Sequence, residues 1–235
     1  MGASSGIGAA LARELDYRGA ELVLSARSED KLKELCGKLK NATAVIADVS
    51  DPKSLRSAAD KIGASASLDG AITLAAIYDP GAAMEADPKE AANIVTVNLT
   101  GSLNFAQPAK PLLTKGGKLV LTGSIAGHFG LPNGQIYSAT IAEVTNLAES
   151  LRTELAGEID VRLVSPGFVK TRLTDENDFE MPFMIEADEA AKEIADGLES
   201  DSFEIHFPKK LTLTLKALRA LPYAASIPLV RRFLQ

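Results

Sequence analysis

Short runs of apolar residues alternate along the chain with longer segments of helical periodicity. The runs are rich in Val, Ile, Leu and Ala and are predicted to be buried strands, at residues 20–26, 42–48, 69–76, 117–123 and 159–167, with a last candidate at 203–207. The segments between them are long enough for helices of ten or more residues. Because parallel strands need crossover helices, this order predicts βαβ units and a parallel sheet with helices on both faces. We expect an α/β, doubly wound, Rossmann-like fold.

The chain is long enough for one domain with a substantial core. It has 235 residues, of which 46% are hydrophobic and 24% charged, and α/β units of this length often fold as one body. No internal repeat, low-complexity tract or linker rich in glycine and serine divides it. We therefore expect a single domain spanning residues 1–235.

Composition argues against several classes of protein. No apolar run reaches the roughly 20 residues that span a bilayer, and the N-terminus lacks the pattern of a signal peptide, so we expect a cytoplasmic protein. The single cysteine, Cys36, cannot form an internal disulfide, and with only two histidines no metal site is predicted. The net charge is −6, but the segment after residue 208 holds six basic residues and no acid, so the remainder of the chain sums to −12. We therefore expect no nucleic-acid binding by the body of the protein.

The chain opens with "MGASSGIGAALAREL", in which Gly2, Gly6 and Gly8 lead into an amphipathic helix. Glycines allow close approach to a pyrophosphate, and free N–H groups at a helix N-terminus bind phosphate. Turns also use glycine, so this motif gains its weight from the helix and the βαβ pattern that follow. A buried strand should precede the loop, but only Met1 does, and its loss would leave a gap of roughly 10 Å in mid-sheet. We expect this first strand to be missing or truncated and the natural chain to begin upstream.

Four further motifs follow the glycine loop in order. They are "ADVSD" (47–51), "NLTG" (98–101), "LTGSIAG" (121–127) and "SPGFVKT" (165–171), and Ser124 stands thirteen residues before Tyr137. Taken singly, Tyr137 suits helix packing, Ser124 a turn and Asn98 a helix kink. Taken together with "GASSGIG" (2–8), the motifs resemble the short-chain dehydrogenase/reductase family over nearly the whole chain.

The resemblance implies a catalytic set and a bound nicotinamide dinucleotide. In such a site Tyr137 donates a proton to a carbonyl, Ser124 holds that oxygen, and Asn98 fixes a water in a proton relay. The implied cofactor contacts are Gly2, Ser4, Ser5, Gly6, Ile7 and Gly8 in the glycine loop, Asp48 and Val49 at the adenine, Ala75 and Ala76 at the ribose, and Pro166, Gly167, Val169 and Thr171 at the nicotinamide.

Two positions depart from the family pattern. After the fourth family strand, "TLAA" (73–76) replaces Asn-Asn-Ala-Gly and lacks the first asparagine's hydrogen bonds. Four residues after Tyr137, Ile141 replaces the lysine that binds the nicotinamide ribose and acidifies the tyrosine. An unassisted tyrosine, with a pKa near 10, is ionised in only about one molecule in a thousand at pH 7. Because a neutral phenol can still donate a proton, we expect a slow enzyme that favours reduction.

The turn after the second predicted strand favours one form of the cofactor. In "LSARSED" Arg27 stands where an acidic residue would accept hydrogen bonds from an unphosphorylated ribose. An arginine can pair with a 2′-phosphate instead, so we favour NADP(H) over NAD(H). Two alternatives stay open, because Arg27 could be a solvated loop residue and Arg18 is a second nearby cation.

The irregular segment after Thr171 predicts a substrate loop at residues 172–185. Its apolar side chains suggest a medium-sized hydrophobic carbonyl or alcohol substrate, although they could equally cover the protein's own core; they are Leu173, Phe179, Met181, Phe183 and Met184. His128 could line the substrate entrance, but a lone histidine is more often a surface loop residue.

The C-terminal segment 209–235 predicts a basic amphipathic tail. Lys209, Lys216 and Arg219 share a helical face, with Leu211, Leu215 and Leu218 opposite. This pattern suits peripheral contact with an anionic membrane, although docking of the leucines on the parent domain is the more common outcome. The family resemblance further implies a homodimer or homotetramer that pairs through helices near 98–114 and 136–156.

These observations leave two main hypotheses of function. The first is an NAD(P)-dependent oxidoreductase that reduces a carbonyl, or oxidises an alcohol, with activity weakened by Ile141. The second is an inactive nucleotide-binding pseudoenzyme that acts as a sensor or scaffold. A damaged gene copy would also account for the short N-terminus and Ile141. The two main hypotheses share a fold, so only chemistry separates them.

Overall fold

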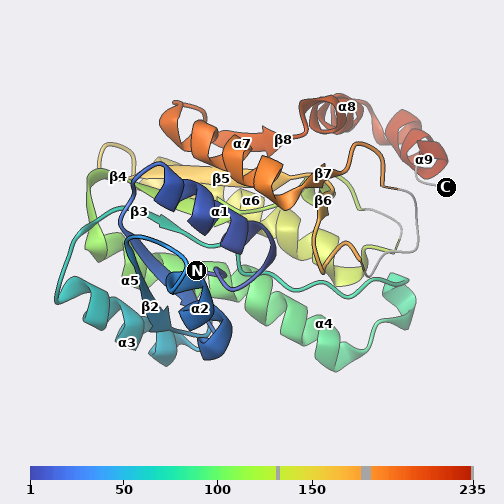
Figure 1. Cartoon of the computed structure of the whole chain (residues 1–235). Coiled ribbons are helices and arrows are strands. Elements are labelled where there is room, and N and C mark those ends of the chain that lie inside the picture. The colour runs from blue at the N-terminus through green and yellow to red at the C-terminus, as the bar shows by residue number, and fades with distance from the viewer. Residues whose placement is uncertain (131–132, 176–180, 234–235) are drawn as a thin grey trace.

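The computed structural model describes residues 1–130, 133–175 and 181–233 and shows a parallel sheet between two layers of helices (Figure 1). All six predicted strands are present and every adjacent pair is parallel. One pair is β2-β1 and the other strands form a four-stranded sheet in the order β3-β4-β5-β8. The strands are β1 (Leu22–Ala26), β2 (Ala42–Ile46), β3 (Leu68–Ile72), β4 (Leu113–Thr122), β5 (Asp160–Pro166) and β8 (Glu204–Phe207).

The helices that cover the sheet begin where the sequence supplies suitable caps. Asp51 and Asp87 accept hydrogen bonds from the first free N–H groups of two helices, and a proline follows each of them. The helices around the sheet are α1 (Gly6–Tyr17), α2 (Glu29–Cys36), α3 (Pro52–Gly63), α4 (Pro88–Val95), α5 (Gly101–Ala109), α6 (Gln135–Glu154) and α7 (Ala187–Glu199). A π-helical turn, Thr96–Thr100, joins α4 to α5.

Alternation along the central strands decides which helices lie on which face. Val120 and Val164 pack with residues of α1 and α7, whereas their neighbours Leu121 and Leu163 pack with residues of α6. Successive side chains of a strand point to opposite faces, so one strand serves both layers. The continuous apolar runs seen in the sequence are therefore strands that are buried on both sides.

The middle of the sheet has a gap between β1 and β3, because these strands are not bonded to each other. The first three residues bridge them. The Met1 amino group donates to the Ile72 carbonyl at 2.7 Å and its carbonyl accepts from the Leu74 N–H, while the Gly2 and Ala3 N–H groups donate to the Ser25 carbonyl. Behind Met1 lies an apolar cavity of about 190 Å³. In the described residues no strand lies between β1 and β3, and both the truncation of the first strand and an upstream start stay predictions.

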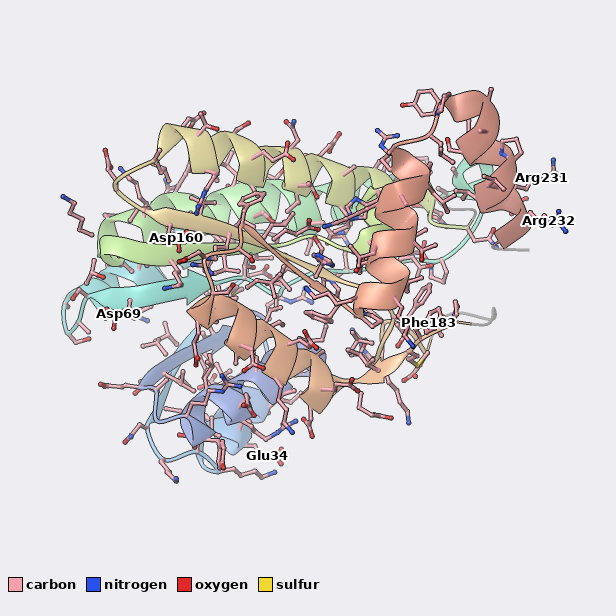
Figure 2. The ribbon with its side chains drawn as sticks, turned by 90° about the horizontal axis from the view of Figure 1, so that it is seen from above. Glu34, Asp69, Asp160, Phe183, Arg231 and Arg232 are labelled. Carbon is pink, nitrogen blue, oxygen red and sulfur yellow. The ribbon has the colours of Figure 1, made fainter. Side chains whose placement is uncertain are left out.

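Two C-terminal helices, α8 (Lys209–Arg219) and α9 (Tyr223–Phe233), lie beyond the last strand. Leu211 and Leu215 are buried against Ile125, with Phe168 packed alongside. The leucine face therefore covers the domain itself, which is the more common of the two outcomes that the sequence allowed. Arg231 and Arg232 project from α9 away from the body (Figure 2). Among the described helices none has the length and apolar character that a membrane span requires.

Candidate active site

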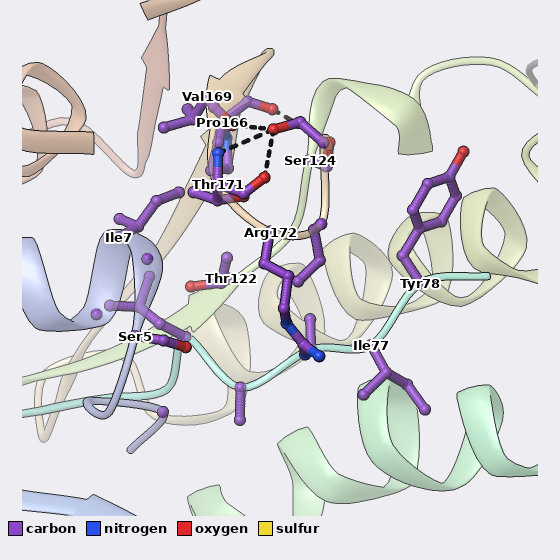
Figure 3. Close-up of a pocket in the computed structure, with 18 of the residues that line it drawn as sticks. Ser5, Ile7, Ile77, Tyr78, Thr122, Ser124, Pro166, Val169, Thr171 and Arg172 are labelled. Carbon is purple, nitrogen blue, oxygen red and sulfur yellow. Dashed lines mark hydrogen bonds between the residues drawn. The ribbon is translucent and has the colours of Figure 1, made fainter. Parts of the chain in front are cut away.

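A cleft of about 670 Å³ opens where the parallel strands end at their carboxyl termini (Figure 3). Residues that follow β1, β3, β4 and β5 line it, together with the first turn of α1 and of α6. Ligands of open α/β sheets bind at this edge, because the strand-to-helix loops converge there. The cleft is therefore the candidate active site.

The glycine loop forms one wall of this cleft with its backbone exposed to a ligand. Ser5 is the N-cap of α1 but its side chain bonds no helix N–H, and the first turn holds no acidic residue. Gly8 is required by packing, since a Cβ there would lie 2.1 Å from the Gly2 carbonyl oxygen. Gly2 has φ +84°, and its Cβ would lie 2.7 Å from the Ala75 nitrogen. A helix N-terminus without a side-chain cap bond and without an acidic first turn fits a phosphate.

Ser124 and Tyr137 meet in the cleft, as their spacing implies. Ser124 follows β4, donates its hydroxyl hydrogen bond to the Pro166 carbonyl at 3.1 Å, and accepts from the Ala126 N–H. Tyr137 lies in the first turn of α6 and is hydrogen-bonded to Ser124. Tyr78 packs edge-on against Tyr137 with ring centroids 4.9 Å apart. Two phenols and one hydroxyl thus share the reacting part of the cleft.

Asn98 is buried in the π-helical turn and does not line the cleft. Its Oδ1 accepts from the Ile77 N–H at 2.9 Å, while Nδ2 donates to the Ile77 carbonyl and to the Thr140 hydroxyl. Thr140 in turn donates to the Tyr137 carbonyl at 2.8 Å. The amide therefore ties the loop after β3 to the first turn of α6, and so positions Tyr78 and Tyr137.

Ile141 is fully buried and leaves Tyr137 without a nearby cation on its own helix. Burial raises the pKa of Tyr137 to about 12, a shift that the hydrogen bond from Ser124 opposes but does not cancel. Lys170 does not compensate, since it faces outward and pairs with Glu186 at 3.2 Å. Tyr137 is therefore a neutral phenol throughout the physiological range.

The charged residues that line the cleft are all basic. Arg27 and Lys31 come after the end of β1, and Arg172 comes directly after Thr171 in the loop that follows β5, while no described lining residue is Asp or Glu. Arg18 is committed elsewhere, because its guanidinium contacts Glu14, Asp196 and Glu199 and ties α1 to α7. The cleft suits an anionic ligand.

Most residues predicted to bind the cofactor line the cleft. They are Gly2, Ser4, Ser5, Gly6, Ile7, Gly8, Arg27, Val49, Ala75, Ala76, Pro166, Gly167, Val169 and Thr171. Asp48 does not, since its carboxylate accepts from the Ser50 N–H and hydroxyl and shapes the turn after β2. Sequence reasoning missed Lys31, Tyr78 and Arg172. The one sequence feature that could have indicated these three residues is their position shortly after the end of a predicted strand.

The predicted substrate loop contributes to the cleft only in its first part. Arg172, Leu173 and Thr174 line the cleft, whereas Phe183 and Met184 are exposed and do not. Phe179 lies outside the described residues. A short parallel ladder that the sequence did not predict, β6 (Val169–Lys170) with β7 (Ile185–Glu186), joins the two ends of the segment.

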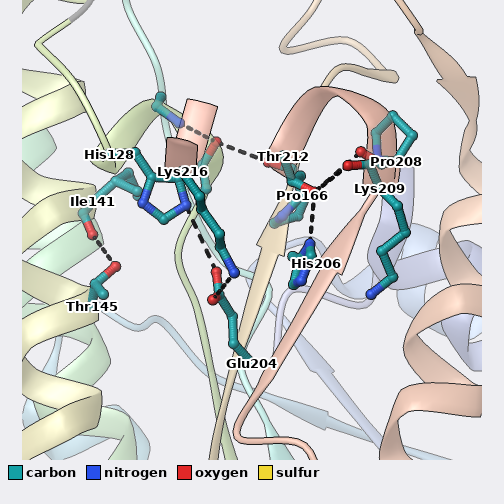
Figure 4. Close-up of polar contacts among 12 residues, drawn as sticks. His128, Ile141, Thr145, Pro166, Glu204, His206, Pro208, Lys209, Thr212 and Lys216 are labelled. Carbon is teal, nitrogen blue, oxygen red and sulfur yellow. Dashed lines mark hydrogen bonds and ion pairs between the residues drawn. The ribbon is translucent and has the colours of Figure 1, made fainter. Parts of the chain in front are cut away.

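His128 is neither a lining residue nor an exposed loop residue. It is half-buried with Nε2 3.8 Å from Glu204 Oε1, and Lys216 of α8 pairs with the other oxygen of Glu204 (Figure 4). Burial lowers the pKa of His128. The histidine thus belongs to a polar contact that holds α8 against β8. Within the described ranges no group of His, Cys, Asp and Glu could hold a metal ion.

Comparison with known proteins agrees with this geometry. The family model described as enoyl-(acyl carrier protein) reductase matches residues 2–197. An uncharacterized oxidoreductase of Myxococcus xanthus is 30% identical over 229 residues, which cover 94% of this chain and 90% of that protein. The 11-beta-hydroxysteroid dehydrogenase-like 4A of Arabidopsis thaliana is 35% identical over 214 residues, covering 84% of this chain and 71% of that protein.

A solved structure extends the similarity to the whole fold. The short chain dehydrogenase from Burkholderia cenocepacia J2315 in complex with NADP superposes with a TM-score of 0.86 at 26% identity, covering 100% of this chain and 95% of that one. The chain therefore belongs to the short-chain dehydrogenase/reductase family, a family of NAD(P)-dependent oxidoreductases.

Proposed function

We propose that this chain is an NADP(H)-dependent reductase that acts on a carbonyl group of a hydrophobic substrate, with a rate lowered by Ile141. The observation that carries the proposal is the meeting of Ser124 and Tyr137 in a cleft whose other wall is the open N-terminus of α1. Proton donor, oxygen-binding hydroxyl and phosphate-binding backbone are thereby present in one space.

The preference for NADP(H) rests on the basic residues beyond β1. Arg27 and Lys31 are exposed, line the same end of the cleft and have no acidic lining residue beside them among the described positions. A 2′-phosphate would pair with both cations, whereas an unphosphorylated ribose would lack the carboxylate that usually accepts from its hydroxyls.

Each reacting residue has a role that its surroundings permit. The nicotinamide, when bound, supplies the hydride. Ser124 would hold the substrate oxygen and Tyr137 would give it a proton, since a phenol with a pKa of about 12 is fully protonated at neutral pH. Asn98 would keep the Tyr78 and Tyr137 segments in register through Ile77 and Thr140. Reduction needs only the neutral phenol, whereas alcohol oxidation needs the tyrosinate.

The substrate class follows from the lining near Tyr137. Ile77, Tyr78, Val97 and Leu173 make this part of the cleft apolar, and Ser124 and Tyr137 are its polar points. An apolar pocket with a few convergent polar groups selects hydrophobic molecules that carry one reactive oxygen. The exposed Phe183 and Met184 lie on the adjoining loop and are available to a larger substrate.

A second candidate function is nucleotide binding without turnover. The buried Ile141 and the raised pKa of Tyr137 favour it, because both weaken proton transfer while leaving the glycine loop intact. The chain would then act as a sensor or scaffold whose conformation depends on the bound dinucleotide.

Fluorescence titration with NADPH and NADH tests the cofactor part of the proposal. NADPH is expected to bind at least tenfold more tightly than NADH, and Arg27→Gln with Lys31→Gln should remove most of that difference, because a charge-assisted pair contributes about 1.5–3 kcal/mol. Arg56→Gln, an exposed arginine on α3, is the matched control. Equal binding of the two nucleotides would overturn the NADP(H) preference.

Turnover separates the two candidate functions. Consumption of bound NADPH is followed by absorbance with a series of hydrophobic ketones and aldehydes, with Tyr137→Phe as the control that lacks the proton donor. Consumption that depends on Tyr137 supports the reductase. Stoichiometric binding with no consumption over hours by either protein would favour the pseudoenzyme.

A further inference from the structure

Arg172 is a basic residue at the cleft whose role neither the family motifs nor the catalytic set accounts for. It follows Thr171 directly and extends from its loop across the cleft toward the segment that carries Ile77 (Figure 3). Within the described part of the chain its guanidinium makes no hydrogen bond or ion pair, in contrast to Arg18, Arg152 and Arg162. An exposed arginine that extends across a cleft and pairs with none of the described side chains is available to a ligand.

The backbone that carries Arg172 is held in place by local hydrogen bonds. The Thr171 N–H donates to the Thr174 hydroxyl at 2.9 Å, and that hydroxyl in turn lies 2.8 Å from the Val169 carbonyl. The Thr174 N–H closes the turn by donating to the Thr171 carbonyl at 3.0 Å. Arg172 thus extends from a fixed turn, which lowers the entropy cost of holding its head group near a ligand.

The turn at residues 171–174 also places Arg172 near one part of the cleft, the N-terminus of α1. The Thr171 methyl group lies 3.3 Å from where a Cβ on Gly6 would stand, so this turn touches the first turn of α1. The open N–H groups of α1 are the phosphate-binding part of the cleft. Arg27 and Lys31 come after the end of β1, and Ile141 adds no charge near Tyr137.

We propose that Arg172 is a positioning residue for the cofactor, whose guanidinium binds the pyrophosphate bridge from the side opposite the N-terminus of α1. This inference rests on the proposed function, because it takes the ligand to be a dinucleotide. A bidentate guanidinium contact fixes the orientation of a phosphate as well as adding affinity. It supplies, at the pyrophosphate, a cationic contact that Ile141 does not supply at the nicotinamide ribose.

Calorimetric titration of the full chain and its variants tests this placement with two probes. One probe is NADPH, and the other is adenosine 2′-monophosphate, which carries the 2′-phosphate but no pyrophosphate. Arg172→Gln is expected to weaken NADPH binding by tenfold or more and to leave the binding of the fragment unchanged, because only NADPH reaches this turn. Arg27→Gln, the matched control, is expected to weaken both. Arg172→Lys should recover part of the loss.

The outcomes separate this inference from the function on which it rests. Unchanged NADPH binding by Arg172→Gln, with tight binding by the parent chain, overturns the placement and leaves the reductase proposal standing. Equal weakening of NADPH and of the fragment also overturns it, since the substitution would then act through the whole cleft. Failure of the parent chain to bind NADPH at all overturns both.

Discussion

At position 141 an isoleucine with 1% of its surface exposed lies one helical turn after Tyr137, the proton donor of the proposed reaction. Burial of Tyr137 without a compensating cation raises its pKa to about 12. This raised pKa affects the two directions of the proposed reaction differently. Reduction uses the protonated form, which is present at every physiological pH, whereas oxidation uses the ionised form, whose fraction grows tenfold with each pH unit below the pKa.

The rate of alcohol oxidation with NADP⁺ should therefore rise about tenfold per pH unit from pH 7 to pH 10 without levelling off. Ile141→Lys should bring the plateau into this range by stabilising the tyrosinate, and should tighten NADPH binding through the ribose. Ile141→Met, similar in length and uncharged, is the control and should keep the steep profile. Steady-state pH–rate profiles provide the measurement. A plateau below pH 9 in the parent chain would show that another group already acidifies Tyr137.

At the scale of elements, the two C-terminal helices differ in what their apolar side chains contact: those of α8 pack on the domain, and several of α9 face solvent. Leu211 and Leu215 of α8 cover Ile125, whereas Tyr223, Ile227 and Leu229 of α9 are exposed. Arg231 and Arg232 end the same helix and point to solvent. Exposed apolar side chains beside two cations suit a shallow contact with an anionic membrane, which we retain as a proposal for α9.

Charge reversal tests this contact better than truncation, because removal of residues 209–235 would uncover Ile125 and Phe168. Arg231→Glu with Arg232→Glu should reduce co-sedimentation with vesicles that contain anionic phospholipid, since each basic residue near such a surface contributes about 1 kcal/mol. Lys53→Glu with Arg56→Glu on α3 is the matched control. If the parent chain and both variants pellet to the same extent, the membrane proposal fails.

At the scale of the whole molecule, the first three residues connect the two parts of the sheet through hydrogen bonds to Ser25, Ile72 and Leu74. The Met1 amino group sits between β1 and β3 and donates to Ile72, and burial lowers its pKa from 8.0 to about 5. A basic group whose pKa is lowered on folding binds its proton more tightly in the unfolded chain. Stability should therefore rise with pH between about 5 and 8.

For the chain that begins at Met1, this group should change the free energy of unfolding by up to about 4 kcal/mol across that window, at about 1.4 kcal/mol per pKa unit. Urea unfolding at pH 5.5 and pH 8 gives the difference. The N-terminally acetylated chain, which has no titrating amine there, is the control and should show a smaller dependence. Identical dependence in the two chains would mean that other groups, such as the partly buried histidines His128 and His206, cause it.

Pairing of two copies of the chain through α5 and α6 stays a prediction.

Much of this arrangement could be predicted from residues close together in the sequence. The strand runs, the glycine loop and the spacing of Ser124 from Tyr137 all concern local patterns, and the structure places them as expected. The inward turn of Asn98 toward Ile77, the packing of Leu211 and the approach of Arg172 to the cleft could not be predicted in this way. Each of these depends on a partner far along the chain.

The sequence by itself determined the parallel α/β architecture, the glycine loop before the first helix and the isoleucine four residues after Tyr137. Periodicity, glycine positions and residue identity need no knowledge of distant contacts, and they suffice for these three conclusions. Only the tertiary structure decided that Tyr137 is buried beyond easy ionisation and that the cleft holds basic but no acidic side chains among its described residues. The burial of a side chain and the charges around it depend on segments that are distant in sequence and meet only in the folded chain, so the pKa of Tyr137 and the charge of the cleft could not be predicted from local sequence.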